Sequence, residues 1–199
     1  MIGIIDYGMG NIHSVQKALE SMGATTLVTN DARKLSGFDK LVLPGVGAFD
    51  DAMIELENRS LDAAIKGAVA DKKIILGICL GMQLFFDESQ EAESKKGLRV
   101  FPGAVKRFGN TLKVPHMGWN NVSLRKQSDL FKNISLAAEF YFVHSFHIES
   151  KKSVEVLGTT NYEYEFVSAL EKENIFGLQF HPEKSHDVGE KVLLNFLQL

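Results

Sequence analysis

Short apolar segments that alternate with amphipathic ones constrain the fold of this chain more than any other feature of its sequence. The apolar segments read as strands, and helical spacing of apolar side chains follows most of them. Because strand–helix–strand connections place parallel strands side by side, this order predicts an α/β fold with a mostly parallel central sheet and helices on both faces. The strand segments are residues 1–5, 25–29, 40–43 and 73–76, and the helical patterns are residues 15–22, 48–57 and 61–70.

After residue 97 the strand-like segments become shorter, and they predict either an extension of the sheet or a small additional β layer. A helical pattern over residues 188–197 closes the chain and is expected to pack on the core. With 4 prolines and glycines spread throughout, no long linker is indicated, so we expect one domain over residues 1–199. The later strand-like segments are residues 113–115, 121–124, 141–143 and 154–157.

The charge and cysteine content exclude several functional classes. A formal net charge of -3 with scattered basic residues gives no basis for binding nucleic acid or a membrane surface. A single cysteine excludes an intramolecular disulfide, and we expect neither a leader peptide nor a membrane span. The sequence therefore predicts a cytoplasmic protein whose partners are small molecules or other proteins.

That single cysteine, Cys79, follows the fourth strand segment between Gly77 and Gly81, and a helical segment begins at Met82. A strand that ends in Gly-x-Cys-x-Gly and continues as a helix is the thiol form of a nucleophile elbow. The helix N-terminus would stabilise a thiolate, and its free amides could bind an oxyanion. Cys79 is therefore a candidate nucleophile.

A candidate base for this thiol follows the apolar segment at residues 177–180. Alternate side chains of extended backbone share a face, and Pro182 favours extended backbone at His181. We therefore expect His181 and Glu183 to point the same way. The carboxylate would hold the imidazole, whose other nitrogen would face Cys79, as in a Cys-His-Glu triad.

Each motif alone also has an ordinary structural explanation. A lone cysteine is most often a small buried apolar residue, and a His-Pro-Glu segment is most often a strand end with a solvated acid. The conjunction favours catalysis, because both motifs follow strands at the edge where open α/β sheets place their sites. The parts together fit acyl transfer.

Two glycine-containing turns are candidates for further binding sites. Residues 44–47, Pro-Gly-Val-Gly, end the strand before the Cys79 strand, so their amides could supply a second oxyanion donor, although a plain strand-to-helix turn is the alternative. Residues 8–11 lack the third glycine of a dinucleotide fingerprint and the Gly-Lys-Ser/Thr ending of a Walker loop. Nucleotide binding there is not expected.

The histidines outside the triad do not predict a metal centre. His116 and His144 lack the paired histidine or carboxylate spacing of metal ligands, so we expect no metal and no cofactor. His144 is expected to be a hydrogen-bonded strand histidine. Trp119 is expected in the core or in an interface.

With these residues placed, the chain closely resembles the class I, triad-type glutamine amidotransferases from end to end. Within that family it resembles the glutaminase subunits of imidazole glycerol phosphate synthase, whose relatives in anthranilate or guanylate synthesis usually differ in the first and fourth matching segments. The resemblance implies a three-layer αβα fold. The matching segments are residues 5–11, 44–47, 77–83, 115–120, 141–145 and 180–185.

The resemblance also implies residue roles. Cys79 would attack the side-chain amide of L-glutamine, His181 would carry the proton to the leaving ammonia, and Glu183 would orient His181. The oxyanion hole would come from Gly45, Val46 and the Leu80 amide. The amino-acid part of glutamine would be held by Gly47, Gln83, Glu91 and the backbone of Ser145 and Phe146.

An ammonia-producing chain without a domain that uses ammonia predicts a separate acceptor enzyme. In the family this partner is a (β/α)-barrel cyclase, the other subunit of a heterodimer, which closes an imidazole ring in histidine biosynthesis. By the same resemblance, the interface or gate residues would be Asn11, Trp119, Tyr141 and Lys184.

Three alternative functions remain open at the level of sequence. The chain could be the glutaminase subunit of another synthase, of the anthranilate or aminodeoxychorismate type. It could be a non-catalytic scaffold, which the intact Cys79, His181 and Glu183 disfavour. A peptide thiol hydrolase would leave the residues that match glutamine binders unexplained.

Overall fold

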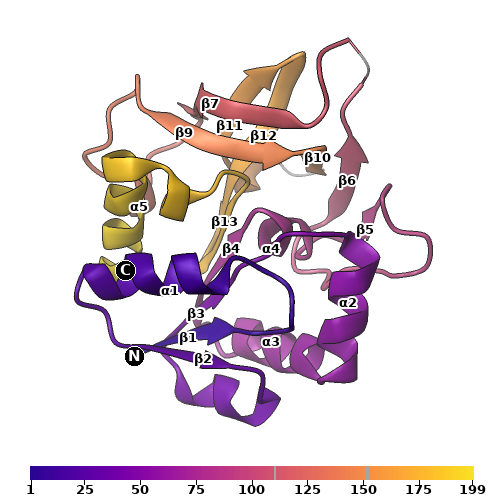
Figure 1. Cartoon of the computed structure of the whole chain (residues 1–199), viewed down its shortest axis with the longest axis vertical. Helices are drawn as coiled ribbons and strands as arrows, with labels where there is room; N and C mark the ends of the chain where they lie inside the picture. Colours follow the sequence, from indigo (N-terminus) through magenta and orange to yellow (C-terminus); the bar gives the residue numbers. More distant parts are fainter. Residues whose placement is uncertain (110, 151–152) are drawn as a thin grey trace.

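A sheet with a parallel half and an antiparallel half carries the fold (Figure 1). The computed structural model describes residues 1–109, 111–150 and 153–199. Every neighbouring pair in the first half is parallel, which confirms the expected α/β class. In sheet order, these strands are β2 (Thr26–Thr29), β1 (Ile2–Ile5), β3 (Lys40–Leu43), β4 (Ile74–Ile78) and β13 (Ile175–Leu178).

Beyond β13 the same sheet continues with mainly antiparallel pairs. A separate two-stranded sheet, β7 (His116–Asn121) with β9 (Glu139–His144), is the expected additional β layer. The strands of the continuation are β12 (Tyr164–Lys172), β10 (Phe146–Ser150), β6 (Gly103–Arg107) and β5 (Glu88–Ser89); off this path, β11 (Val156–Tyr162) pairs with β12, and β8 (Ser123–Leu124) pairs with β11.

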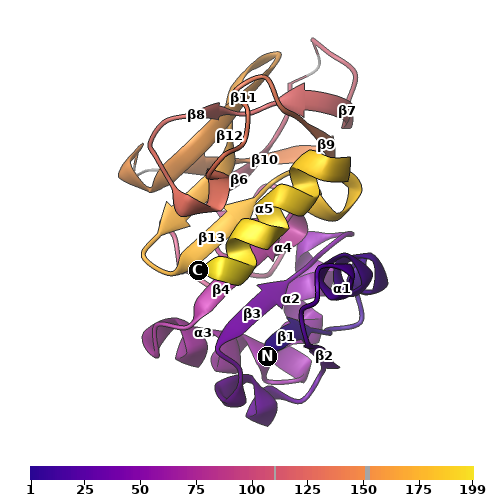
Figure 2. The same ribbon diagram turned by 90° about the vertical axis from the view of Figure 1, so that its left-hand side faces the viewer.

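Helices cover both faces of the parallel strands, so the fold has three layers (Figures 1 and 2). Strand residues alternate between the two faces: Val42 packs in the same core cluster as α1 (Ile12–Ser21) and α5 (His186–Gln198). Its neighbours Leu41 and Leu43 pack on the opposite side. That opposite face is covered by α2 (Phe49–Asn58), α3 (Leu61–Ala70) and the short α4 (Leu80–Gln83). Within the described ranges, no helix is long and apolar enough to cross a membrane.

Short 3-10 helices complete the secondary structure of the described residues, and one of them alters a predicted boundary. The expected strand at 154–157 begins only at Val156, because residues up to Glu155 form a 3-10 turn. The expected strand at 113–115 is wrong, since β7 begins at His116, after a proline that has no N–H for a strand ladder. The 3-10 helices are η1 (Ala32–Gly37), η2 (Asp129–Phe131), η3 (Ser153–Glu155) and η4 (Pro182–Lys184).

The register of three parallel strands brings distant loops to one edge of the sheet. Ile75 of β4 is paired with Leu41 of β3 on one side and with Ile175 of β13 on the other. Since the strands run in the same direction, their carboxyl ends lie together. The segments that follow them are residues 44–47, the turn at Cys79, and residues 179–181.

The turn into α4 packs directly against the end of β3. A Cβ atom added to Gly81 would lie 1.8 Å from the carbonyl oxygen of Leu43. Because that oxygen belongs to the backbone of a buried strand, it cannot move aside without displacing the sheet. Glycine at this position therefore sets how closely α4 approaches β3.

We predict that Gly81→Ala lowers the free energy of unfolding by about 3 kcal/mol, since the new methyl group overlaps backbone. Gly67→Ala is the matched control, because no atom outside its own helix lies within 4 Å of a Cβ there. It should raise stability by about 0.5–1 kcal/mol, as alanine does in exposed helix interiors. Urea denaturation of both variants measures these changes, and equal stabilities would contradict the close approach.

Candidate active site

Cys79 occupies the sharp turn between β4 and α4, as the nucleophile-elbow motif predicts. Its backbone has φ 53° and ψ -110°, in the left-handed half of the map that a non-glycine residue rarely enters. The turn is held from both sides: the Cys79 amide donates to the Leu178 carbonyl at 2.7 Å, and the Cys79 carbonyl accepts from the Met82 and Gln83 amides at 3.1 and 3.2 Å. Strained backbone of this kind costs about 1–3 kcal/mol and persists where the surroundings fix it.

His181 and Glu183 lie together, as expected, but for a different backbone reason. His181 itself is extended, whereas Pro182 begins the 3-10 turn η4, so the expectation of one continuous extended segment is wrong. Proline suits the first position of a helical turn, where no N–H is required. The turn brings the carboxylate back to the ring, and His181 Nδ1 donates to Glu183 Oε1 at 2.8 Å.

The electrostatics of this pair favour an imidazolium. Burial opposes the charged ring, yet the negative charges of the Cys79 thiolate and the Glu183 carboxylate raise the pKa of His181 to about 10. The other ring nitrogen, Nε2, is buried without a hydrogen-bond partner in the described part of the chain. The imidazolium therefore has Cys79 and Glu183 as its electrostatic partners.

Asn11 contacts this carboxylate directly. Its side-chain Nδ2 donates to Glu183 Oε1 at 3.1 Å. Asn11 does stand at the N-cap position of α1, but its side chain makes no capping hydrogen bond, because the amide is directed toward Glu183 instead. Asn11 therefore belongs to the surroundings of His181 and Glu183.

The turn at residues 44–47 lies against the elbow with a carbonyl, not an amide, facing it. The Leu80 amide donates to the Gly45 carbonyl at 3.4 Å. In a trans peptide the C=O and the following N–H point in opposite directions, so the Val46 amide faces away from Leu80. The Tyr7 hydroxyl holds the start of the turn by donating to the Pro44 carbonyl at 2.9 Å. The two expected oxyanion donors do not converge in this structure.

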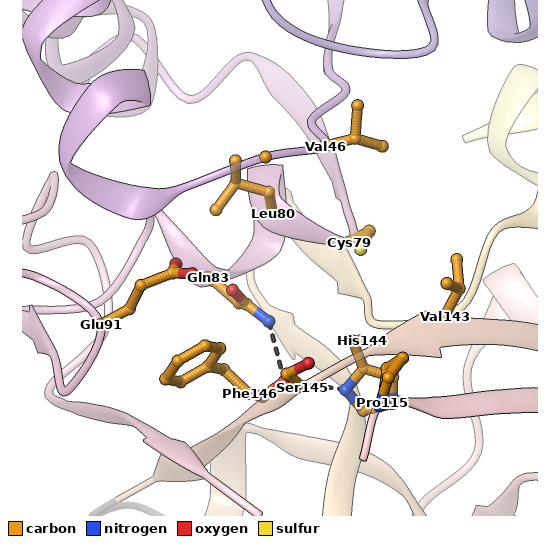
Figure 3. A pocket seen from close by; sticks show the side chains of 11 residues that line it. Val46, Cys79, Leu80, Gln83, Glu91, Pro115, Val143, His144, Ser145 and Phe146 are labelled. Atoms are coloured by element: carbon orange, nitrogen blue, oxygen red, sulfur yellow. Dashed lines mark hydrogen bonds between the residues drawn. The ribbon is translucent and has the colours of Figure 1, made fainter.

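A cavity of about 350 Å³ opens beside Cys79 (Figure 3). It unites all five residues expected to hold the substrate, from four different segments of the chain. His181 and Glu183 are not among the lining residues. The lining residues are Val46, Gly47, Cys79, Leu80, Gln83, Glu91, Pro115, Val143, His144, Ser145 and Phe146.

Two polar side chains of the cavity are already partly engaged. Glu91 Oε2 accepts from the Phe49 amide at 2.9 Å, at the start of α2, and burial raises the pKa of Glu91 although this hydrogen bond opposes the change. Gln83 Nε2 donates to the Phe146 carbonyl at 3.0 Å, the contact drawn in Figure 3. Among the described residues, no hydrogen bond uses the Gln83 amide oxygen, which remains available to a ligand.

A buried histidine pair supports one wall of the cavity. His144 Nδ1 lies 2.8 Å from the Phe146 carbonyl, and His144 Nε2 lies 3.0 Å from His116 Nδ1. Burial lowers the pKa of His144 to about 3 and that of His116 to about 4, so both rings are neutral. This confirms His144 as a hydrogen-bonded strand histidine.

The expected interface residues lie on one face near His181. Trp119 is 43% exposed, so it is not a core residue. Its ring meets Tyr141 edge-on at 5.9 Å between centroids and stacks on His186 at 5.0 Å, while Lys184 Nζ lies 6.0 Å from the centre of the Tyr141 ring. Trp119, Lys184 and His186 are exposed and Tyr141 is half-buried, and the Tyr141 carbonyl accepts from the His181 amide at 2.9 Å, so these side chains form a cluster next to His181.

Gln179 and Tyr7 were not singled out by their sequence motifs. Gln179 is fully buried and donates through Nε2 to Cys79 Sγ at 3.7 Å. A polar residue two positions before His181, in a segment otherwise apolar, is the signal that could have identified it, because alternate residues share a face. Nothing comparable marks Tyr7, whose contact with Pro44 arises only in the fold.

We predict that Glu183→Gln lowers the pKa of His181 markedly, because it removes one of the two negative charges that favour the imidazolium. Nuclear magnetic resonance titration of the ring protons measures this. In the parent protein the protonated ring favours the folded state fully below about pH 6.5, and that contribution disappears as the pH rises through about 10.

Glu149→Gln serves as the matched control for this titration, because Glu149 pairs with Lys106 in an ion pair outside the cavity lining. It should leave the His181 titration unchanged. If His181 in Glu183→Gln kept the pKa of the parent protein, the contact between His181 Nδ1 and the Glu183 carboxylate would be contradicted.

The comparisons with known proteins agree with this geometry. Residues 3–198 match the family model "Glutamine amidotransferase class-I". The chain is 49% identical over 201 residues to "Imidazole glycerol phosphate synthase subunit HisH" of Chlorobium chlorochromatii and 45% identical over 199 residues to that of Methanocaldococcus jannaschii, each covering 100% of both chains. The fold is similar to "PurLQS from Thermotoga maritima" (TM-score 0.73, 20% identity, covering 99% of this chain and 97% of that chain). The chain therefore belongs to the class I glutamine amidotransferase family and, within it, to the family of the HisH subunits of imidazole glycerol phosphate synthase.

Proposed function

We propose that the chain is the glutaminase subunit of an imidazole glycerol phosphate synthase. The observation that carries the proposal is the buried Cys79, whose turn faces a cavity lined by all the expected glutamine-binding residues, in a chain nearly half identical to HisH subunits over its full length. The reaction is hydrolysis of L-glutamine to glutamate and ammonia.

In the first step, Cys79 Sγ attacks the carbonyl carbon of the glutamine side-chain amide, and an S–C bond forms. The C–N bond then breaks as His181 gives its proton to the departing nitrogen, which leaves as ammonia. The product on the protein is a glutamyl thioester. Glu183 keeps the imidazole oriented and stabilises its positive form.

In the second step, neutral His181 accepts a proton from a water molecule that attacks the thioester carbon. A C–O bond forms, the C–S bond breaks, and the sulfur leaves as a thiolate. Glutamate departs, and the thiolate–imidazolium pair is restored. No cofactor is needed for either step.

The cavity supplies complementary groups for the amino-acid part of glutamine. Glu91 and the free amide oxygen of Gln83 suit the substrate ammonium group, since both accept hydrogen bonds. Gly47, Ser145 and Phe146 close the walls around the backbone of the substrate. The Phe146 carbonyl already accepts hydrogen bonds from Gln83 and His144. We therefore expect it to shape the cavity wall rather than to bind the substrate directly.

Oxyanion stabilisation requires a rearrangement of the turn at residues 44–47. We infer that rotation of the Gly45–Val46 peptide would release the Leu80 amide and aim the Val46 amide at the same point. Removing one oxyanion donor typically costs about 10²–10³-fold in turnover. A subunit with the peptide as it stands would therefore hydrolyse glutamine slowly.

The acceptor of ammonia is proposed to be a separate (β/α)-barrel cyclase, with which the chain forms a heterodimer in the cytoplasm. The exposed cluster of Trp119, Tyr141 and Lys184 beside the triad suits an interface, because aromatic residues are enriched at the centres of such surfaces. Docking there places the acceptor beside the cavity where ammonia forms.

We predict that the isolated chain has weak glutaminase activity and that adding the cyclase with its nucleotide substrate raises kcat by about 10²-fold or more, since both oxyanion donors become available. Glutamate release measures the rates. Cys79→Ala should abolish activity and selective labelling by a glutamine-analogue electrophile. Full activity of the isolated chain, indifferent to the cyclase, would refute the assignment.

The peptide rotation has its own test. In a crystal structure of the Cys79→Ala variant bound to glutamine and the cyclase, the Val46 amide should point at the substrate carbonyl oxygen and the Leu80 amide should be free of Gly45. An unchanged Gly45–Val46 peptide in that complex would rule out the rearrangement.

A further inference from the structure

The sulfur of Cys79 has a neighbour that the triad mechanism does not use. We propose that Gln179 is a catalytic hydrogen-bond donor to the reacting sulfur and that Gln83 sets the direction of that donor. The inference deepens the proposed glutaminase function and rests on it for its place in the reaction.

The orientation of both amides follows from one backbone atom. The Phe146 carbonyl can only accept, so the Gln83 atom 3.0 Å away is its NH₂ nitrogen. The same nitrogen lies 3.0 Å from the Gln179 side chain, which must present its oxygen there. The Gln179 nitrogen is thereby turned toward Cys79 Sγ, at 3.7 Å.

The Phe146 carbonyl, where this chain of hydrogen bonds begins, is also held by a pair of histidines. Neutral His144 donates from Nδ1 to the same Phe146 carbonyl, because that oxygen can only accept. His144 Nε2 is then an acceptor, and His116 donates to it from Nδ1. A carbonyl held by two donors does not rotate freely, so the direction imposed on Gln83 is maintained.

Both amides are buried, which makes their direction strongly determined. Gln179 is fully inaccessible to solvent, and its backbone amide donates to the Ser168 carbonyl at 2.9 Å. If the Gln179 amide turned over, its nitrogen would face the Gln83 nitrogen and its oxygen would face the sulfur. Both contacts would be unfavourable, and unfavourable polar contacts cost most in a buried site.

The Gln179 N–H donor stabilises negative charge on the Cys79 sulfur. In the free protein it stabilises the Cys79 thiolate, and it acts again when the thioester breaks and the sulfur leaves with the electron pair. The Gln83 oxygen faces the cavity while its nitrogen holds Gln179, so one side chain contacts both the substrate site and the donor. Glutamine binding and the state of the sulfur are therefore linked through Gln83.

Other titratable groups also act on Cys79, and a test must leave them in place. His181 follows β13, Tyr7 comes from the turn after β1, and Glu183 stands behind His181. Glu91 and His144 belong to the cavity wall. Replacing Gln179 by methionine removes the donor, keeps an unbranched side chain of similar length, and alters none of these groups.

The experiment is the rate of Cys79 alkylation by iodoacetamide as a function of pH, on the full chain without glutamine or a partner. On the acidic side of the profile, below the pH of half-maximal rate, we expect Gln179→Met to react about tenfold more slowly than the parent, as for loss of a hydrogen bond to a charged group. The pH of half-maximal rate should rise by about 1 pH unit. At the alkaline plateau the rate should equal or exceed that of the parent, because a thiolate without a donor is more nucleophilic.

This pattern separates a donor from a packing residue, since a distorted site would slow alkylation at every pH. The exposed Gln127→Met is the matched control and should leave the profile unchanged. A folded Gln179→Met with the parent's pH profile would overturn the proposal. Alkylation requires no glutaminase activity, so this result is distinct from a failure of the proposed function.

A second variant keeps the proposal testable if Gln179→Met does not fold. Gln83→Met removes the group that orients Gln179, so its alkylation profile should move in the same direction. In the double variant the two effects should not add, because both act through one donor. A folded Gln83→Met with the parent's profile, or fully additive effects, would refute the coupling between the two amides.

Discussion

The parallel pairing of β4 between β3 and β13 is the constraint on which the rest of the site depends. It places the carboxyl ends of three strands, far apart in the sequence, beside one another. Cys79, the proposed nucleophile, follows the central strand, the turn at residues 44–47 follows one neighbour, and His181 follows the other. A slip of the register by one residue would reverse which side chains face each layer, so the burial of both sheet faces protects the geometry of the site.

Cys79 is held in place by its surroundings, whereas the backbone amides proposed to bind the oxyanion do not point to a common site. Cys79 is fixed by backbone hydrogen bonds on both sides of a strained turn, and its charge partner is buried next to it. The Gly45 carbonyl, in contrast, satisfies the Leu80 amide that an oxyanion would need. A backbone carbonyl at 3.4 Å is a weak competitor, so rotating one peptide costs far less than rebuilding the elbow. The turn at residues 44–47 is therefore the segment on which the proposed activation by a partner would act.

Local patterns predicted much of this arrangement, and tertiary contacts explain what they missed. Strands such as β1 and helices such as α3 agree with their apolar spacing because burial on a single face fixes both. One expected strand did not form at Pro115, because proline has no N–H to donate to a strand ladder. The pairing of His181 with Glu183 was predicted from extended backbone, but residues 182–184 form a 3-10 turn. The role of Gln179 depends on a hydrogen bond to a residue about a hundred positions away, which no local pattern encodes.

The turn between β1 and α1 contacts both halves of the site, and this has a physical consequence for control. Tyr7 donates to the Pro44 carbonyl at the start of the oxyanion turn, and Asn11 donates to the carboxylate that orients His181. Burial raises the pKa of the Tyr7 hydroxyl, with the Cys79 charge adding to the effect, so Tyr7 remains a donor throughout the working pH range. Neither contact can shift alone without displacing a turn of only six residues, 6–11. Both the segment at residues 44–47 and the carboxylate beside His181 therefore have a contact with this one turn, and a displacement of the turn would alter both.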